Sequence, residues 1–155
     1  MRVALYQPDI AGNVGTLIRL GACLGVGVDL IEPMGFPFGD RAMARAAMDY
    51  VERTEVRRHA DWPAFAEQAA GRLVLLTTRG ATPLWDAAFR ADDVLLLGSE
   101  GAGVPEHVHA AAGLRVAISS RPGCRSLNVA VAAAMAVGEA LRQTRAAPPF
   151  AAGPC

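Results

Sequence analysis

The stretch Val94-Leu-Leu-Leu-Gly-Ser-Glu-Gly-Ala-Gly-Val-Pro105 decides the fold of this chain. Its first four residues form a short apolar run, which is typical of a buried strand. Three glycines follow within six residues, and glycine lets the backbone approach a ligand closely. The order G-x-x-G-x-G is neither the dinucleotide fingerprint nor a Walker P-loop, which would need Gly-Lys-Ser/Thr. Taken alone, the loop is compatible with an adenosine site and equally with a tight structural turn.

Short apolar runs alternate with longer amphipathic segments on both sides of this stretch. Strands are expected at Val3–Tyr6, Val28–Glu32, Leu73–Thr77, Val94–Leu97 and Leu114–Ile118. Helices are expected at Val14–Leu24, Asp40–Met48, Trp62–Ala70, Pro105–Ala112 and Ser126–Arg142. Strands that alternate with helices predict an α/β fold, with a mostly parallel sheet that carries helices on both faces. Ligands of such sheets bind beyond the carboxyl ends of the strands, so the loops after strands are the informative ones.

Length and composition predict one domain over residues 1–145, followed by a flexible tail at 146–155 that lacks apolar periodicity. No signal peptide or membrane-spanning stretch is recognisable, so we expect a cytoplasmic protein that does not contact a membrane. The three cysteines, Cys23, Cys124 and Cys155, are odd in number and widely spaced. They therefore predict reduced thiols rather than disulfides. No histidine has a ligand partner at i+4, and no metal is expected.

The formal net charge is zero, which argues against a protein that grips nucleic acid mainly by bulk electrostatics. All 15 basic residues are nonetheless arginine. Codon usage explains part of this bias, and the planar fork that arginine offers to phosphates and bases explains the rest. Arg115, Arg121 and Arg125 lie in a segment without any acid, which predicts a local positive loop.

The loop after the first strand is Gln7-Pro-Asp-Ile-Ala-Gly-Asn-Val-Gly15, and it leads into the first helix. Gly12 and Asn13 suit a helix start, whose free N–H groups favour an anion. Arg19 lies off the apolar stripe of this helix, one turn past Thr16. An isolated helical arginine is ordinarily a solvated surface residue, so the residue pattern alone does not assign Arg19 a role.

The loop Ser119-Ser-Arg-Pro-Gly-Cys-Arg-Ser-Leu-Asn128 opens the last helix. Ser126 can serve as its N-cap, which would put Asn128 in the first turn, in either a capping or a ligand role. The helix that follows is apolar all round until Glu139 and must be covered on every side. Either the sheet plus a loop or a partner subunit could cover it. We favour the partner subunit, with small residues permitting close approach at Ala130, Ala134 and Gly138.

Together these loops resemble the three signature motifs of the SPOUT superfamily of knotted methyltransferases, and most of all the tRNA (cytidine/uridine-34 2′-O)-methyltransferase family. The resemblance rests on segments in the family's order and spacing from about residue 2 to 145. They are Leu5-Tyr-Gln-Pro-Asp-Ile-Ala-Gly-Asn-Val-Gly-Thr-Leu-Ile-Arg-Leu20, Ile31-Glu-Pro-Met-Gly-Phe36, Ala47-Met-Asp-Tyr50, Gly98-Ser-Glu-Gly-Ala-Gly-Val-Pro105, Arg121-Pro-Gly-Cys-Arg-Ser-Leu-Asn128 and Glu139-Ala-Leu-Arg-Gln143.

The resemblance implies a C-terminal trefoil knot, a homodimer through the C-terminal helix, and S-adenosylmethionine as methyl donor without a metal. The substrate it implies is the wobble ribose in the tRNA anticodon stem-loop. The implied cofactor-binding residues are Leu76, Thr77, Gly98, Gly103, Ile118, Ser126 and Leu127. The implied catalytic residues are Arg19, Asn13, Glu100 and Asn128. RNA contacts are implied for Arg19, Arg121 and Arg125.

Three departures from the family pattern concern the acceptor nucleotide. Glu100-Gly-Ala-Gly103 is closer to the sibling guanosine 2′-O-methylases, Gly138 stands where tyrosine is common, and Val131 stands where a second asparagine often sits. A SPOUT enzyme acting on another tRNA or rRNA ribose therefore remains an alternative. A nucleotide-binding module without chemistry and a dimeric scaffold are the alternatives from other classes.

Arginine keeps its proton at any physiological pH and is a reluctant base. We therefore expect Arg19 to bind the acceptor's phosphate or 2′-oxygen and to stabilise alkoxide charge as it develops.

Overall fold

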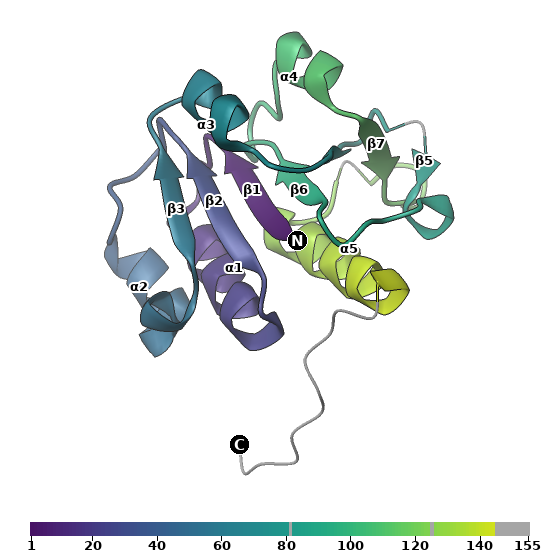
Figure 1. The fold of residues 1–155 in the computed structure, drawn as a ribbon. Coiled ribbons are helices and arrows are strands. Elements are labelled where there is room, and N and C mark those ends of the chain that lie inside the picture. The colour runs from purple at the N-terminus through teal and green to yellow at the C-terminus, as the bar shows by residue number, and fades with distance from the viewer. Residues whose placement is uncertain (81, 125, 145–155) are drawn as a thin grey trace.

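The computed structural model describes residues 1–80, 82–124 and 126–144, and it contains a parallel sheet with helices on both faces (Figure 1). The strands are β1 (Arg2–Tyr6), β2 (Gly27–Ile31), β3 (Val56–His59), β4 (Leu73–Leu76), β5 (Thr82–Pro83), β6 (Val94–Leu97) and β7 (Leu114–Ala117). The α-helices are α1 (Ala11–Leu24), α2 (Arg41–Ala47), α3 (Trp62–Gln68), α4 (Glu106–Ala111) and α5 (Val129–Thr144). Short 3-10 helices cover Met48–Arg53 and Leu84–Asp86. The α/β class, the five expected strands and the five expected helices are thereby confirmed.

The seven strands pair in the order β3-β2-β1-β6-β4-β7-β5, and every pair is parallel. Strand β6 lies between β1 and β4, with Leu97 opposite Leu5 on one side and Leu76 on the other. All four residues of β6 are buried, as its apolar run predicted. This places the glycine-rich loop after β6 near the middle of the sheet edge.

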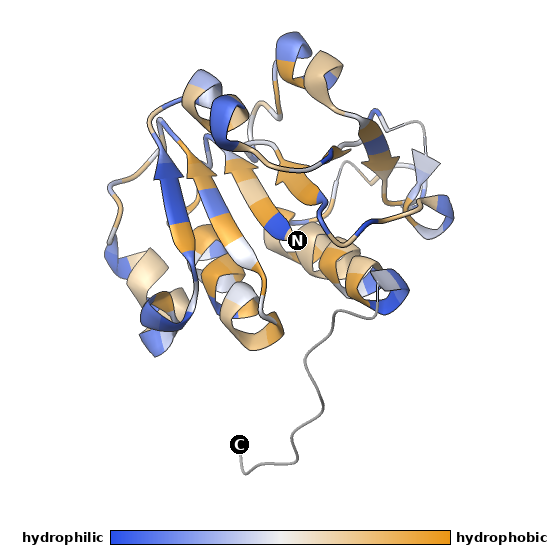
Figure 2. Cartoon of the chain, in the orientation of Figure 1, coloured by the Kyte–Doolittle hydropathy of each residue, from blue (hydrophilic) through white to orange (hydrophobic). Residues whose placement is uncertain are grey.

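Two strands were not expected from the sequence. Strand β3 reads Val-Arg-Arg-His and lies at the edge of the sheet, where its two arginines are exposed. Figure 2 shows β3 as hydrophilic beside the apolar strands β2, β1 and β6. Strand β5 is only two residues long and forms the other edge. Edge strands are often short or charged, and that removes the apolar pattern by which strands are recognised.

Side chains that alternate along the strands separate two cores. Val3, Leu30 and Leu95 belong to the core beneath α1, α2 and α5. Ala4 and Leu96, one residue further along their strands, belong to the core that contains Phe65 of α3 and Val108 of α4. Burial on both faces makes the central strands almost wholly apolar.

Helix α5 is covered less completely than the sequence suggested. Its residues Ala133, Ala136 and Val137 are fully buried against the sheet, whereas Val131 is 49% exposed. Ala134 and Gly138 are exposed on the same side. Ala130 is buried in the chain's own core, so it is not available for contact with a partner. The expectation that all three small residues face a partner is therefore wrong for Ala130.

Among the described residues no helix is both long and apolar enough to span a membrane.

The far end of α5 is fixed to the segment before β6. The Gln143 carboxamide accepts a hydrogen bond from the Phe89 N–H and donates one to the Ala87 carbonyl, both at 2.9 Å. Glu139 forms hydrogen bonds with Arg142 and Gln143, which lower the pKa of its carboxyl to about 2. The motif Glu139–Gln143 thus ties the last helix to the loop before the central strand.

Candidate functional site

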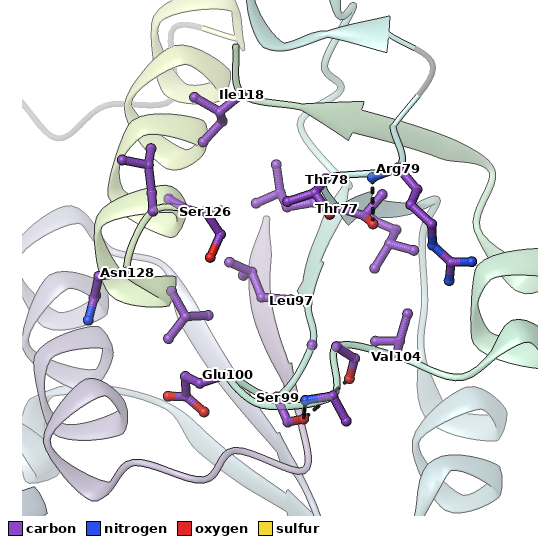
Figure 3. Close-up of a pocket in the computed structure, with 18 of the residues that line it drawn as sticks. Thr77, Thr78, Arg79, Leu97, Ser99, Glu100, Val104, Ile118, Ser126 and Asn128 are labelled. Atoms are coloured by element: carbon purple, nitrogen blue, oxygen red, sulfur yellow. Dashed lines mark hydrogen bonds between the residues drawn. The ribbon is translucent and has the colours of Figure 1, made fainter. Parts of the chain in front are cut away.

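A cavity of about 590 Å³ opens at the carboxyl ends of β4, β6 and β7. Its walls come from three loops, which follow these strands and include Thr77–Arg79, Gly98–Val104 and Ser126–Asn128. Figure 3 shows Thr77 and Thr78 across the cavity from Ser126 and Asn128, with Ser99 and Glu100 on the loop at its base and the Arg79 side chain directed away from Ser126. A cavity of this size at the ends of parallel strands suits a nucleotide-sized ligand.

The glycine-rich loop folds back on itself at the base of this cavity. The N–H of Ser99 donates to the Gly103 carbonyl at 3.1 Å, and the N–H of Gly103 donates to the Ser99 carbonyl at 2.9 Å. A Cβ atom at Gly98 would lie 2.4 Å from the Gly103 carbonyl carbon, and no side chain can fit there. Gly103 has a φ of +69°, in the left-handed region that favours glycine. The glycines therefore close the loop tightly and leave its backbone bare toward the cavity.

Glu100, Asn13 and Asn128 form one chain of hydrogen bonds at the mouth of the cavity. The Asn13 amide donates to Glu100 Oε1 at 2.7 Å, and the Asn128 amide donates to Asn13 Oδ1 at 3.0 Å. Three elements distant in sequence meet here: helix α1, the loop after β6, and the residue before α5. Because Asn13 is only 9% exposed, this chain fixes the orientation of its amide.

Asn128 is the N-cap of α5, rather than a residue of its first turn as expected. Its Oδ1 accepts hydrogen bonds from the N–H of Ala130 at 2.9 Å and from that of Val131 at 3.3 Å. Ser126 lies before the cap and lines the cavity instead. The capping and site roles of Asn128, which the sequence left as alternatives, use different atoms of one side chain.

Asp9 completes the anchoring of Glu100. The Asp9 N–H donates to Glu100 Oε2 at 2.9 Å, and Asp9 Oδ2 accepts from the Gly101 N–H at 3.1 Å. Each carboxylate oxygen of Glu100 therefore accepts one hydrogen bond, which fixes the orientation of the side chain. Sequence reasoning missed Asp9, although it lies inside the quoted segment that begins at Leu5.

His109 of α4 is buried and contributes to the cavity wall, which the sequence did not predict. Burial lowers the pKa of its imidazole, and the nearby positive charges of Arg79 and Arg115 lower it further, against the opposing effect of Glu106. The imidazole is therefore neutral at neutral pH and adds no charge to the cavity. Its position two residues after an exposed histidine, His107, gave no signal in the sequence.

The cavity gathers all seven residues expected to bind the cofactor. They are Leu76, Thr77, Gly98, Gly103, Ile118, Ser126 and Leu127. Asn13, Glu100 and Asn128 line the same cavity. Their roles toward a ligand remain predictions. Among the described residues, no group of three or more His, Cys, Asp or Glu side chains could hold a metal ion.

Two of the three arginines expected to contact RNA, Arg19 and Arg121, do not line the cavity. Arg19 is on the exposed side of α1, with its guanidinium carbon 5.6 Å from the centre of the Tyr50 ring. Arg53 approaches the same ring at 5.7 Å. Arg121 is exposed and does not line the cavity. Arg125 lies outside the described residues. Arg19 and the three cavity residues therefore do not come together within one chain.

The chain matches known RNA methylases over most of its length. Residues 1–138 match the model of the SpoU rRNA Methylase family. A protein of Beijerinckia indica named tRNA (cytidine(34)-2′-O)-methyltransferase is 56% identical over 147 residues, which cover 93% of this chain and 92% of that protein.

Two solved structures have the same fold. One, described as "Structural insights into the 2-OH methylation of C/U34 on tRNA", has a TM-score of 0.87 and 38% identity, and covers 92% of this chain and 94% of its own. The other is an AdoMet-bound rRNA methyltransferase from Sinorhizobium meliloti, with a TM-score of 0.82 and 29% identity over 91% of this chain and 55% of its own. From the family match, the identities and the shared fold together, we conclude that this chain belongs to the SpoU family of RNA methylases.

Proposed function

We propose that the protein transfers a methyl group from S-adenosylmethionine to the ribose 2′-hydroxyl of nucleotide 34 in tRNA, a cytidine or a modified uridine. The observation that carries the proposal is the hydrogen-bonded chain of Glu100, Asn13 and Asn128 beside a nucleotide-sized cavity. The name of the relative that is 56% identical supports nucleotide 34 as the acceptor. A ribose elsewhere in tRNA or rRNA is the second candidate, favoured by the family description and by Gly101 and Ala102 in the glycine loop.

The cavity fits S-adenosylmethionine, because its volume of about 590 Å³ suits a nucleotide-sized ligand and the loop at its base presents the backbone of three glycines. Backbone around Leu76, Gly98 and Ile118 would hold the adenosine, and Ser126 and Leu127 would hold the remainder. An AdoMet-bound relative of the same fold supports this assignment. When bound, the sulfonium supplies an activated methyl group, so the protein needs to provide positioning more than activation.

The chain's own residues would align the acceptor. The fixed carboxamides of Asn13 and Asn128 would orient the ribose so that its 2′-oxygen lies in line with the methyl carbon, and such positioning can supply several kcal/mol. The bound S-adenosylmethionine would supply the methyl group and become S-adenosylhomocysteine, and the proton of the 2′-hydroxyl would pass to solvent water. Arg19 would stabilise negative charge as it develops on the 2′-oxygen.

The distance of Arg19 from the cavity makes a homodimer part of this proposal. We propose that two chains associate through the exposed strip of α5, which includes Val131, Ala134 and Gly138. An isologous contact presents the same surface of both chains, so a second copy could bring its Arg19 to the first copy's cavity. The exposed apolar side chains of Ile10 and Leu127, 49% and 43% exposed, also support an interface beside the cavity.

The remaining finer features are proposed together. The chain after β7 would form the trefoil knot of the SPOUT fold, and the position of β7 between β4 and β5 supports this. Arg19, Arg121 and Arg125 would contact the phosphates of the anticodon stem-loop. We also propose that the protein acts in the cytoplasm, as its reduced thiols suggest.

The function is tested by incubating the purified protein with tritiated S-adenosylmethionine and unmodified tRNA, followed by nuclease mapping. We expect label on the ribose of nucleotide 34. Label on a ribose elsewhere would transfer the protein to the second candidate, and label on a base or no label would overturn the proposal.

The dimer is tested by comparing Ala134→Glu with Ala66→Glu, a matched change at an exposed residue of α3. Both charges are tolerated by a single chain, because both side chains are exposed. Only Ala134→Glu buries an unpaired charge if α5 forms the interface. Sedimentation at micromolar concentration should show a monomer for Ala134→Glu and a dimer for Ala66→Glu. A wild-type monomer would refute the dimer.

A further inference from the structure

A second hollow, of about 440 Å³, lies beside the glycine loop and is distinct from the large cavity. It shares Ser99, Gly101 and Ala102 with the large cavity, so one loop forms a wall of both. Its other walls come from the chain after β1, which includes Gln7, and from the turn after β2, which includes Met34. A ligand in this hollow would therefore lie next to Glu100. Glu100 accepts a hydrogen bond from Asn13, which is proposed to orient the acceptor ribose.

The polar groups of the hollow are mostly committed to the protein. Asp9 is engaged with Gly101 and Glu100. The Ser99 hydroxyl bonds to the Gly103 carbonyl and accepts from the Ala102 N–H. The Gln7 carboxamide, by contrast, makes no hydrogen bond to any residue that the structure describes, although its backbone N–H donates to the Ile31 carbonyl at 2.9 Å.

The backbone holds Gln7 in an unusual conformation. Its φ is +45°, in the left-handed region that residues other than glycine rarely adopt. Backbone strain of this kind persists only where the surroundings impose it, and it concentrates at ligand sites. Here the hydrogen bond to β2 and the tight approach of Gly35, whose Cβ would lie 3.2 Å from Asp9 Cα, hold the chain on both sides of Gln7.

We propose that this hollow receives the base of the acceptor nucleotide and that the carboxamide of Gln7 reads its Watson–Crick edge, an inference that rests on the proposed function. Proteins usually recognise unstacked bases by contacting this edge and packing against the base faces. Pro33 and Met34 supply the apolar contact. A carboxamide presents one acceptor and two donors, and turning it over exchanges them. It can therefore pair with cytosine in one orientation and with uracil in the other.

The inference is tested by a double-mutant cycle in which one change removes Gln7 and the other removes the edge of the base. Gln7→Gly suits the positive φ and removes the carboxamide, so the variant should keep the melting temperature of the wild type or exceed it. The substrate is an anticodon stem-loop with cytidine at position 34, compared with one that carries a phenyl riboside there. The phenyl ring keeps the shape of the base and lacks its hydrogen-bonding edge.

On the cytidine substrate, Gln7→Gly should lower kcat/KM roughly tenfold, the size of one lost hydrogen bond in a desolvated site. On the phenyl substrate it should change kcat/KM by less than about twofold, because the two changes remove the same interaction. Affinity for S-adenosylmethionine should be unchanged. The matched control is Gln68→Gly at an exposed residue of α3, which should leave kcat/KM unchanged on both substrates.

Equal losses on both substrates would give Gln7 a structural role and overturn the inference, as would the absence of any loss. In both outcomes the wild-type protein still transfers methyl to the cytidine substrate. Absence of methyl transfer by the wild-type protein would instead overturn the proposed function, so the two failures are distinguishable.

Discussion

The cavity and the exposed side of α1 differ in how complete they are within one chain. Three loops line the cavity, and two of them are linked by hydrogen bonds from Glu100 through the almost wholly buried Asn13 of α1 to Asn128. Beside the exposed side of α1, the guanidinium groups of Arg19 and Arg53 lie near the ring of Tyr50, and Arg53 also pairs with Asp49. The part of the proposed site that would hold the methyl donor is thus preorganised within one chain. Arg19, by contrast, remains accessible to RNA or to a second copy of the chain.

Adding a side chain at Gly98 in the glycine loop is the change with the largest expected effect. It should disrupt the cavity and leave the exposed side of α1 unchanged. Gly98→Ala puts a Cβ against the backbone of Gly103, so the loop that lines the cavity must shift. Calorimetry should show affinity for S-adenosylmethionine reduced by about a hundredfold or more. Gly12→Ala, where a Cβ meets nothing within 4 Å, is the control and should bind normally. Near-normal binding by Gly98→Ala would mean that the cofactor lies elsewhere.

Removing the guanidinium of Arg19 should have the converse result. Arg19→Ala should lower methyl transfer to tRNA by about a hundredfold or more while leaving affinity for S-adenosylmethionine within a few-fold, because Arg19 lies outside the cavity. Arg19→Lys should restore little, since an ammonium cannot reproduce the planar fork. The measurements are tritiated methyl transfer and calorimetry on the same preparations. Full activity of Arg19→Ala would show that the exposed side of α1 has no part in the reaction.

Asn128 caps helix α5 and also donates a hydrogen bond to Asn13 in the proposed site. Variants of Asn128 should separate the two contributions. Asn128→Ser keeps a capping oxygen for α5 but loses the amide that donates to Asn13, so turnover should fall roughly tenfold with little change in stability. Asn128→Ala should lose turnover to a similar extent and also about 1 kcal/mol of unfolding free energy. Urea unfolding and methyl transfer measure the two effects. Equal stability of both variants would mean that the cap contributes nothing.

The smallest expected effect concerns the pH dependence of stability, to which His109 in the wall of the cavity contributes. Because the pKa of His109 is lowered by burial, the unfolded chain binds a proton near its ordinary pKa of about 6.5 while the folded chain does not. Stability should therefore decline as the pH falls below about 6.5. His109→Gln should reduce this decline, and His107→Gln, at an exposed position, is the matched control. Unfolding free energies at several pH values provide the test, and identical curves for His109→Gln and the wild type would contradict it.

The sequence predicted which loops line the cavity, but it predicted neither the order of the strands nor the separation of Arg19 from the cavity. Loops that follow buried parallel strands must meet at one edge, so the glycine loop and the loop before α5 could be brought together from their positions alone. The pairing order could not, because nothing in the apolar run Val94–Leu97 says which neighbours it has. Strand β3 was missed because its arginines face solvent at the sheet edge. The N-cap of α5 was misplaced by two residues because both Ser126 and Asn128 are good N-caps.

The position of β6 between β1 and β4 has a consequence for how the chain is made. Residues of β1 leave the ribosome about ninety positions before their partners in β6, since Arg2 lies opposite Val94. Until β6 arrives, β1 is an unpaired apolar edge, the kind of surface that promotes association between unfinished chains. Loop closure over such a separation also slows folding. The centre of the sheet, and with it the glycine loop, can therefore form only after most of the chain has been synthesised.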